Sequence, residues 1–290
     1  MAEEYYNLGN SNLAAGKVER ALALFELAIR ADPSLLQAHY NLSLALLRAG
    51  RGEQAMRNLE ELAARDPDNL MIVSLQGYAA YRLGRFDEAL ARYEGVLTRA
   101  PGDREALYNK GLVLEKLGRT AEAGQAFASV ADRSPGDELA LEALLRIARV
   151  QREAKAWDRV AAALERYAEW KPESAAALLD LAAAYRAQEK YLPAIEIYRR
   201  AAALAPENTE AWASQAELLL TVIEDPEGGL QALERALRGG FADRARLSAL
   251  VADERLLERE RVRALLLRWG VLEEAAAKDA AAVPATSAKP

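Results

Sequence analysis

Two consecutive stretches of equal length decide the fold: residues 2–35 read AEEYYNLGNSNLAAGKVERALALFELAIRADPSL, and residues 36–69 read LQAHYNLSLALLRAGRGEQAMRNLEELAARDPDN. Both have a glycine at the fifteenth position and a proline near the end, and the same step continues through residues 70–103 and 104–137. The glycines are Gly16, Gly50, Gly84 and Gly118, and the prolines are Pro33, Pro67, Pro101 and Pro135. A fixed period of 34 residues is typical of a stack of similar supersecondary units.

Each repeat is predicted to fold as a helix, a tight turn and a second helix. Glycine at the fifteenth position can adopt the left-handed conformation that ends a helix, and proline ends the second helix because it has no N–H to donate. The eighth and twentieth positions hold small residues, which let two crossing helices approach closely. These are Gly9, Ser43, Gly77 and Gly111 at the eighth position, and Ala21, Ala55, Ala89 and Ala123 at the twentieth. A bulky residue stands at the twenty-fourth position: Phe25, Leu59, Tyr93 and Phe127.

The composition restricts the classes of function. The chain of 290 residues has a net charge of −6 and no cysteine. The acidic balance argues against nucleic-acid binding, which needs a basic face, and the lack of cysteine excludes disulfides and thiol chemistry. No apolar run is long enough to span a membrane, and the acidic N-terminus does not resemble a signal peptide. We therefore expect a cytoplasmic protein, with an exported protein whose signal has been removed as the alternative. Abundant alanine and arginine favour a bacterial source.

The repeat resembles the tetratricopeptide repeat (TPR). The family motif has small residues at positions 8, 20 and 27, an aromatic residue near position 24 and a proline at position 32, and residues 2–208 match this pattern. The resemblance implies an all-α fold, a right-handed α-solenoid of about seven helix–turn–helix repeats with a helical cap at its C-terminal end. It also implies a non-catalytic protein that binds protein partners in a concave groove.

The later repeats depart from the period. Pro135 and Pro172 lie 37 residues apart, which places a three-residue insertion near residues 136–140, and Lys155 replaces the turn glycine. We expect repeats one to four in residues 2–137 and repeats five to seven in residues 138–241. Residues 242–272 are predicted to form the cap from two helices, residues 243–252 and about 255–269, with N-caps at Asp243 and Asp253. Residues 273–290 are predicted to be a disordered tail.

No set of residues indicates catalysis, and we predict neither an enzyme nor a metal or cofactor site. Catalysis needs acid, base or nucleophile groups that converge in a concave site. The one histidine, His39, occupies a position held in the other repeats by Tyr5, Val73 and Leu107, so we expect a helix-packing residue. No glycine-rich loop of the phosphate-binding kind is present.

The resemblance assigns the groove to the first helix of each repeat, at positions 2, 5, 6, 9, 12 and 13. In repeats one to four these positions and their neighbours hold tyrosines and asparagines. Asparagine could hydrogen-bond the backbone of an extended peptide, because an amide both donates and accepts, and tyrosine offers contact area with a polar tip. The candidate peptide-binding residues are Tyr6, Asn7, Asn10, Tyr40, Asn41, Tyr78, Tyr81, Tyr108 and Asn109. The alternatives are packing between helices for the tyrosines and a tolerated helix-surface position for the asparagines.

Arginines take over in the later repeats, three of them at three-residue steps near one helical stripe. This predicted basic patch consists of Arg146, Arg149, Arg152 and Arg186. Arginine prefers carboxylates, so the patch suits an acidic segment or a terminal carboxylate. The alternative is ion pairing with Glu142, Glu153 and neighbouring residues. We expect the insertion near residues 136–140 to divide the groove into a tyrosine and asparagine half and an arginine half.

The chaperone-binding type of TPR clamp is not matched. That type has lysine, asparagine and arginine at set groove positions, and only two asparagines agree among Tyr6, Asn10, Asn41, Met71 and Leu75. We therefore predict a protein-interaction scaffold that binds an extended peptide or protein segment in its groove. The alternatives are an adaptor or assembly factor that docks a larger complex through its convex face or cap, and a structural homo-oligomer that associates through repeat seven and the cap. An enzyme of unknown type is the least favoured.

Overall fold

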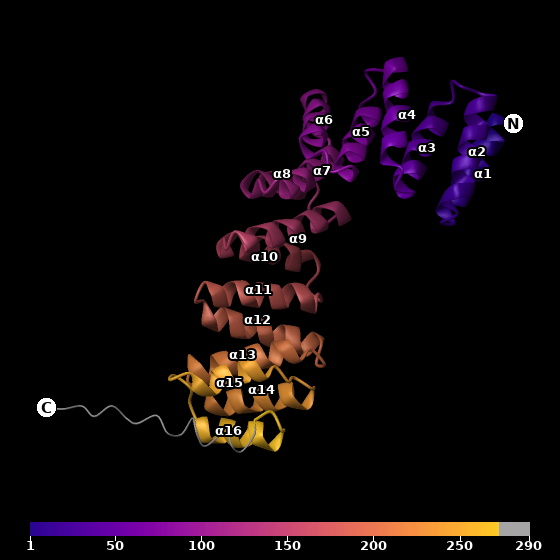
Figure 1. The fold of residues 1–290 in the computed structure, drawn as a ribbon. Coiled ribbons are helices and arrows are strands. Elements are labelled where there is room, and N and C mark those ends of the chain that lie inside the picture. The colour runs from indigo at the N-terminus through magenta and orange to yellow at the C-terminus, as the bar shows by residue number, and fades with distance from the viewer. Residues whose placement is uncertain (273–290) are drawn as a thin grey trace. The chain divides into compact units, whose positions relative to one another are not determined.

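Figure 1 shows the computed structural model of the chain, which describes residues 1–272 as α-helices joined by short turns. No strand occurs in this part of the chain. Each of the first four repeats contains one pair of helices: α1 (Ala2–Ala14) and α2 (Val18–Ala31), α3 (Leu36–Arg48) and α4 (Gly52–Arg65), α5 (Leu70–Arg82) and α6 (Phe86–Arg99), α7 (Arg104–Lys116) and α8 (Thr120–Arg133). The predicted helix–turn–helix unit is therefore confirmed.

Each of the next three repeats also contains one pair of helices: α9 (Glu138–Glu153) and α10 (Trp157–Trp170), α11 (Ala175–Ala187) and α12 (Tyr191–Leu204), α13 (Thr209–Thr221) and α14 (Pro226–Arg238). Helix α9 has 16 residues, whereas the first helices of the four preceding repeats have 13. The insertion is therefore accommodated as almost one additional helical turn. Asp137 caps the lengthened helix, because its carboxylate accepts a hydrogen bond from the Ala140 N–H at 2.8 Å.

The turn inside each repeat depends on one residue in the left-handed conformation. Gly84 has a φ of 76°, and Lys155 and Glu189, which replace the glycine in repeats five and six, have φ values of 55° and 60°. This conformation costs a residue other than glycine roughly 1–2 kcal/mol. The packing of the two helices therefore imposes the turn even where the side chain disfavours it.

The small residue at the eighth position lies against the bulky residue at the twenty-fourth position of the same repeat. Phe25 packs on Gly9, and Phe127 packs on Gly111. A Cβ atom on Gly111 would lie 2.6 Å from Phe127 Cε1, which is closer than two carbon atoms can approach. The glycine is therefore needed for the close crossing of α7 and α8.

The cap consists of two short helices, α15 (Arg244–Ala252) and α16 (Arg259–Arg268). Asp243 caps α15 as predicted, and its carboxylate accepts from the Arg246 N–H at 3.0 Å. The predicted start of the second helix at about residue 255 is wrong, because Asp253 does not cap it. The Asp253 carboxylate instead accepts from the backbone and the side chain of Arg255. Helix α16 begins after Glu258, which is in the left-handed conformation.

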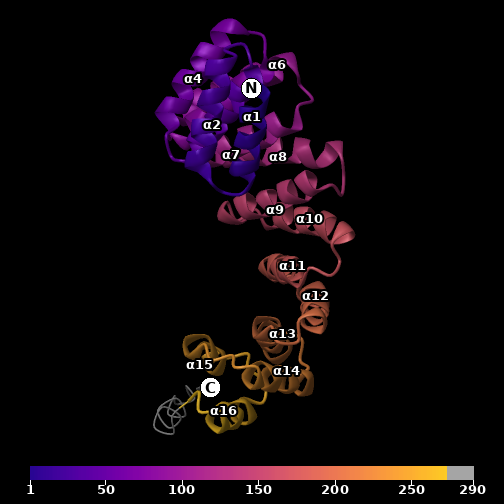
Figure 2. The same cartoon turned by 90° about the vertical axis from the view of Figure 1, so that its right-hand side faces the viewer.

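The cap shares one apolar core with repeat seven. Leu247 and Leu250 of α15 and Val262 of α16 belong to the same buried cluster as Leu220 of α13 and Leu233 of α14. The turn before α16 is also tied to α13, because the N–H of residue 257 donates to the carbonyl of residue 220 at 2.9 Å. Figure 2 shows α15 beside α13.

The chain divides into two compact units, Met1–Ala154 and the residues from Lys155 onward. The boundary falls inside repeat five, between α9 and α10, whereas the predicted division of the repeats lies between residues 137 and 138. Within each unit, each helix of the repeats packs on the one before and the one after it. The predicted disordered tail, residues 273–290, lies outside the described residues. None of the described helices is both long enough and apolar enough to cross a membrane.

Candidate functional site

Helices α1 and α3 bring three of the predicted groove residues together. The Asn41 side-chain amide on α3 donates to Asn10 Oδ1 at 2.6 Å and to Tyr6 Oη at 3.3 Å, both on α1. These bonds use both hydrogens of the Asn41 amide. Within residues 1–272, Asn41 Oδ1 and Asn10 Nδ2 make no hydrogen bond. One acceptor and one donor therefore remain available next to each other.

A pocket of about 370 Å³ lies beside this asparagine pair. No charged residue is among those that line it, although 28% of the chain is charged. Met71, at the pocket, is 60% exposed. The pocket therefore suits an uncharged side chain. Its lining residues include Tyr6, Tyr40, Asn41, Leu36, Met71 and Ile72.

The other predicted groove residues of repeats one to four do not join this cluster. Tyr78 accepts a hydrogen bond from Arg82 Nη1 at 3.1 Å, and the same guanidinium lies over its ring. Tyr81 packs on Phe86 with the ring centroids 5.8 Å apart. The two remaining asparagines are the exposed Asn7 on α1 and the half-buried Asn109 on α7.

Tyr108 is buried on α7 and lies edge-on to Phe127, with the ring centroids 5.4 Å apart. Its hydroxyl donates to Glu142 on α9 and accepts from Arg146 Nε at 3.2 Å. Burial, and then the hydrogen bond to Glu142, raise the pKa of Tyr108 to about 12. Because Tyr108 and Arg146 are in contact, the expected tyrosine and arginine halves of the groove adjoin at this point.

The arginines of α9 are paired inside the chain. Arg149 donates to Glu115 of α7, and Arg146 lies 3.7 Å from Glu142 and 3.9 Å from Glu115. Arg152 also has a partner. The alternative of ion pairing with Glu142 is therefore present, and Glu115 is a second partner that the sequence reading did not name.

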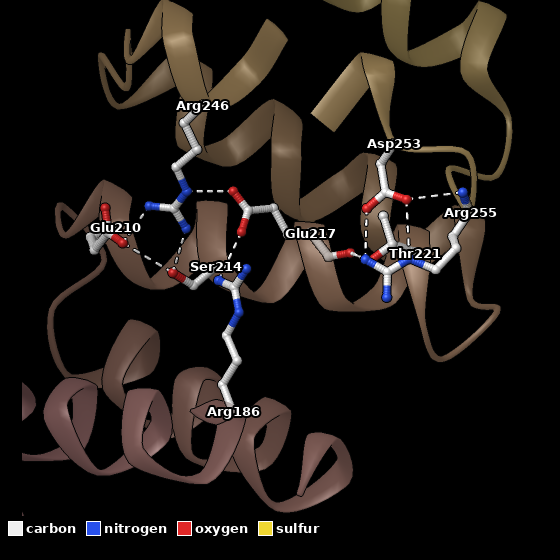
Figure 3. A network of polar contacts seen from close by, with 8 residues as sticks. All are labelled: Arg186, Glu210, Ser214, Glu217, Thr221, Arg246, Asp253 and Arg255. Atoms are coloured by element: carbon white, nitrogen blue, oxygen red, sulfur yellow. Dashed lines mark hydrogen bonds and ion pairs between the residues drawn. The ribbon is translucent and has the colours of Figure 1, made fainter. Parts of the chain in front are cut away.

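The fourth predicted arginine, Arg186, lies on α11 in the second compact unit, where Figure 3 shows a separate polar network. Arg246 of α15 contacts three side chains of α13. Its Nη1 donates to Glu210 Oε1 at 2.5 Å and its Nη2 to Ser214 Oγ at 2.8 Å, and its Nε donates to Glu217 Oε1. Burial alone would lower the pKa of Arg246, but the hydrogen bonds to Glu217 and Glu210 outweigh it and raise the pKa.

Glu217 links this network to α11. Its side chain is 11% exposed, and its Oε2 lies 2.8 Å from Arg186 Nη1. A pocket of about 480 Å³ opens beside it, bounded by α11, the start of α12, α13, α15 and the turn after α15. We call it the cap pocket, and its polar lining residues are Arg186, Tyr191, Glu217, Thr221, Arg246, Asp253 and Arg255.

His39 is a buried packing residue, as predicted, with 4% of its surface exposed. Its Nδ1 lies 3.1 Å from Asn58 Oδ1, and its Nε2 lies 3.2 Å from the Pro33 carbonyl oxygen. Both ring nitrogens therefore have partners inside the fold. Across residues 1–272, no group of three or more histidine and acidic side chains could hold a metal ion.

Comparison with protein families agrees with the repeat geometry. Family models of the tetratricopeptide repeat match residues 12–77, 74–138 and 175–208, which together cover more than half of the chain. The chain belongs to the tetratricopeptide repeat family. Proteins of this family are typically non-catalytic and bind protein partners, so this TPR protein is a protein-interaction scaffold.

Solved TPR structures share the fold. The C-terminal part of a TPR repeat-containing protein from Cytophaga hutchinsonii has a TM-score of 0.69 at 13% identity, and the match covers 84% of this chain and 99% of that one. A TPR protein from Parabacteroides merdae has a TM-score of 0.53 at 17% identity, and the match covers 86% of this chain and 97% of that one. PilF of Pseudomonas aeruginosa has a TM-score of 0.56 at 22% identity, and the match covers 74% of this chain and 97% of that one. No curated protein sequence matches the chain. Identities this low establish the fold alone.

The TPR register shows how part of the second network could have been found from the sequence. Glu210, Ser214 and Glu217 occupy positions 2, 6 and 9 of repeat seven, which are groove positions. Extending the register through this repeat reveals a polar, acidic stripe. Its partner Arg246 lies beyond the periodic part of the chain, where no register relates a residue to a helix face.

Proposed function

We propose that this TPR protein binds an extended peptide across α1 and α3, with Asn10 and Asn41 recognising the peptide backbone. The observation that supports this proposal is the unused donor on Asn10 and the unused acceptor on Asn41, held together by the bond between the two amides. A peptide backbone offers C=O and N–H groups, so a peptide carbonyl can accept from Asn10 Nδ2 and a peptide N–H can donate to Asn41 Oδ1.

The uncharged pocket next to the asparagine pair supports a partner with a bulky apolar side chain. Tyr6 and Asn41 belong both to the pair's hydrogen-bond network and to the pocket lining, so the backbone contact and the side-chain contact adjoin. Covering the exposed Met71 and the rings of Tyr6 and Tyr40 would remove apolar surface from water. The asparagine pair binds only the peptide backbone and so does not distinguish peptide sequences. The pocket would supply the preference for a particular side chain.

The test is selection of peptides from a displayed random library on the full chain, followed by measurement of affinity for the variants. Asn41→Ala removes the bond to Asn10 and the free acceptor, so we expect affinity to fall at least about tenfold, as for loss of one or two hydrogen bonds. The matched control is Asn12→Ala on α1, because the Asn12 amide only donates to the Leu8 carbonyl of its own helix at 2.8 Å. Circular dichroism checks the fold of both variants. Equal affinities for the two variants would refute the proposal.

The proposal gives Arg149 the contact with any acidic residue of the partner. Its side chain is 52% exposed, whereas that of Arg146 is 29% exposed. A carboxylate of the partner would compete with Glu115 for this guanidinium. Arg149 is therefore easier for a ligand to reach than Arg146.

Exposed tryptophans favour a second candidate function, an adaptor that docks a larger complex outside the groove. Trp269, directly after α16, is 38% exposed, and Trp170, at the end of α10, is 53% exposed. Tryptophan is enriched among the residues that dominate protein interfaces. Loss of the native partner in Trp269→Ala, together with its retention in Asn41→Ala, would favour the adaptor.

A further inference from the structure

Helix α15 lies on the groove face of repeat seven. Arg246 contacts Glu210, Ser214 and Glu217, the side chains at groove positions 2, 6 and 9 (Figure 3). Leu247, one residue further along α15, is 1% exposed in the shared core, so the helix is fixed in place. Helix α15 therefore covers this face, and the cap pocket lies between α15, α13, α11 and the start of α12.

Both carboxylates that line the cap pocket have their acceptor oxygens occupied. Glu217 accepts from Arg246 through Oε1 and pairs with Arg186 through Oε2. Asp253 Oδ1 accepts from the Arg255 N–H and Nε, each at 3.0 Å, and its Oδ2 accepts from Arg255 Nη2 at 2.8 Å. The hydrogen bonds from Arg255 lower the pKa of Asp253 to about 2. Neither carboxylate needs a further donor from a ligand.

Several donors of the cap pocket remain unused. Within the described part of the chain, Arg186 Nε and Nη2, the Tyr191 hydroxyl and Arg255 Nη1 make no hydrogen bond. The three guanidinium groups of the pocket are balanced by Glu217, Asp253 and Glu210, the last of which pairs with Arg246. Both lining carboxylates are already occupied, so the unused N–H and O–H donors favour a ligand that brings its own negative charge.

We propose that the cap pocket binds a carboxylate-bearing ligand, with Arg186 and Tyr191 as the principal donors. A guanidinium can offer two parallel N–H groups to a carboxylate, and Arg186 retains two donors beside the one that holds Glu217. The carboxylate can come from the end of a partner polypeptide or from a free organic acid. The site uses no residue of the asparagine pair on α1 and α3, so the two proposals can fail independently.

The experiment is an NMR titration of the ¹⁵N-labelled full chain with N-acetyl-L-leucine and with N-acetyl-L-leucine amide. We expect the acid to shift amide signals around Thr221 and Asp253, and the uncharged amide to leave them unchanged. Arg186→Gln should weaken binding of the acid at least about tenfold, because it removes a charge-assisted hydrogen bond. Tyr191→Phe, which removes one hydroxyl, should weaken it by a smaller factor. The matched control is Arg238→Gln on α14, whose side chain is 71% exposed.

The outcomes separate the proposal from its alternatives. Equal shifts with the acid and the amide, no shift with either, or equal affinities of Arg186→Gln and Arg238→Gln would overturn it. If the acid binds as expected, the source follows from a second comparison, between a short peptide with a free C-terminus and succinate. Tighter binding of the peptide assigns the pocket to a chain end, and tighter binding of succinate assigns it to a free organic acid.

Discussion

At the scale of single residues, helix glycines in the same compact unit have opposite roles. Gly111 of α7 lies against Phe127, and a Cβ there would meet the ring at 2.6 Å, whereas a Cβ on Gly95 of α6 would meet no atom within 4 Å. We expect Gly111→Ala to lower the free energy of unfolding by about 1–3 kcal/mol through overpacking. Gly95→Ala should raise it by about 0.5–1 kcal/mol, because alanine loses less conformational freedom in a helix. Urea denaturation of the two variants measures both changes.

The sign of the difference is what tests this close packing. If Gly111→Ala were as stable as the natural chain, the ring of Phe127 would have room to move, and the close crossing of α7 and α8 would not depend on glycine. A loss of stability in Gly95→Ala would instead show that this site has a partner on its open side.

The residue scale also shows where sequence reading reaches its limit. The turn glycines were predicted from their period, and Gly84 and Gly118 have positive φ. The same conformation at Lys155 and Glu189 is imposed by the flanking helices, against the preference of the residues themselves. The register of the repeats predicted that Asn10 and Asn41 are groove residues, but it did not predict the bond between them, which depends on two helices lying side by side.

At the scale of elements, one ion pair ties the start of α7 to the N-cap of α9. Arg104 donates to both oxygens of Asp137 at 2.5 and 2.7 Å, and this bond, followed by the Ala140 N–H, lowers the pKa of Asp137 from 3.8 to about 2. Because the folded-state pKa lies below the unfolded value, the ionised carboxylate stabilises the fold above about pH 3.8. This contribution is lost as the pH falls through about 2. Urea denaturation at a series of pH values should show that Asp137→Asn is less stable than the natural chain at pH 5, and that the difference shrinks towards pH 2.

The partner residue provides the control for this pH dependence. Arg104→Gln removes the main cause of the lowered pKa while the carboxylate and its capping bond to Ala140 remain. The same shrinking difference from the natural chain is therefore expected in this variant. A difference that stays constant between pH 5 and pH 2 in both variants would show that the ion pair does not carry the acid sensitivity.

Helices could be predicted from the sequence in the part of the chain where the repeat continues. The 34-residue columns gave α1 to α8, and the insertion reappears as the added turn of α9. The cap has no such register, so Asp253 was wrongly predicted to be an N-cap. Its carboxylate instead accepts hydrogen bonds from Arg255. For the same reason, neither the contact of Arg246 with α13 nor the cap pocket that it borders could be derived from spacing.

At the scale of the whole molecule, stability is expected to be local because each helix packs mainly on its neighbours in the chain. Leu233 of α14 is 1% exposed and belongs to the core shared by repeat seven and the cap. Leu233→Ala should cost about 2–5 kcal/mol through loss of packing and the cavity left behind. Hydrogen exchange followed by mass spectrometry should show faster exchange in α13 to α16, with α1 to α6 unchanged.

The corresponding cavity-forming substitution in the first compact unit is the control. Leu62 of α4 is also 1% exposed, so Leu62→Ala makes a cavity of the same chemical kind, and it should speed exchange in α3 to α6 while α13 to α16 keep their protection. Nearest-neighbour coupling requires this crossed pattern, because the loss of one interface changes the opening free energy only of the helices next to it. Faster exchange throughout residues 1–272 in both variants would mean that the chain opens as one cooperative body, and the two compact units would then share a single unfolding transition.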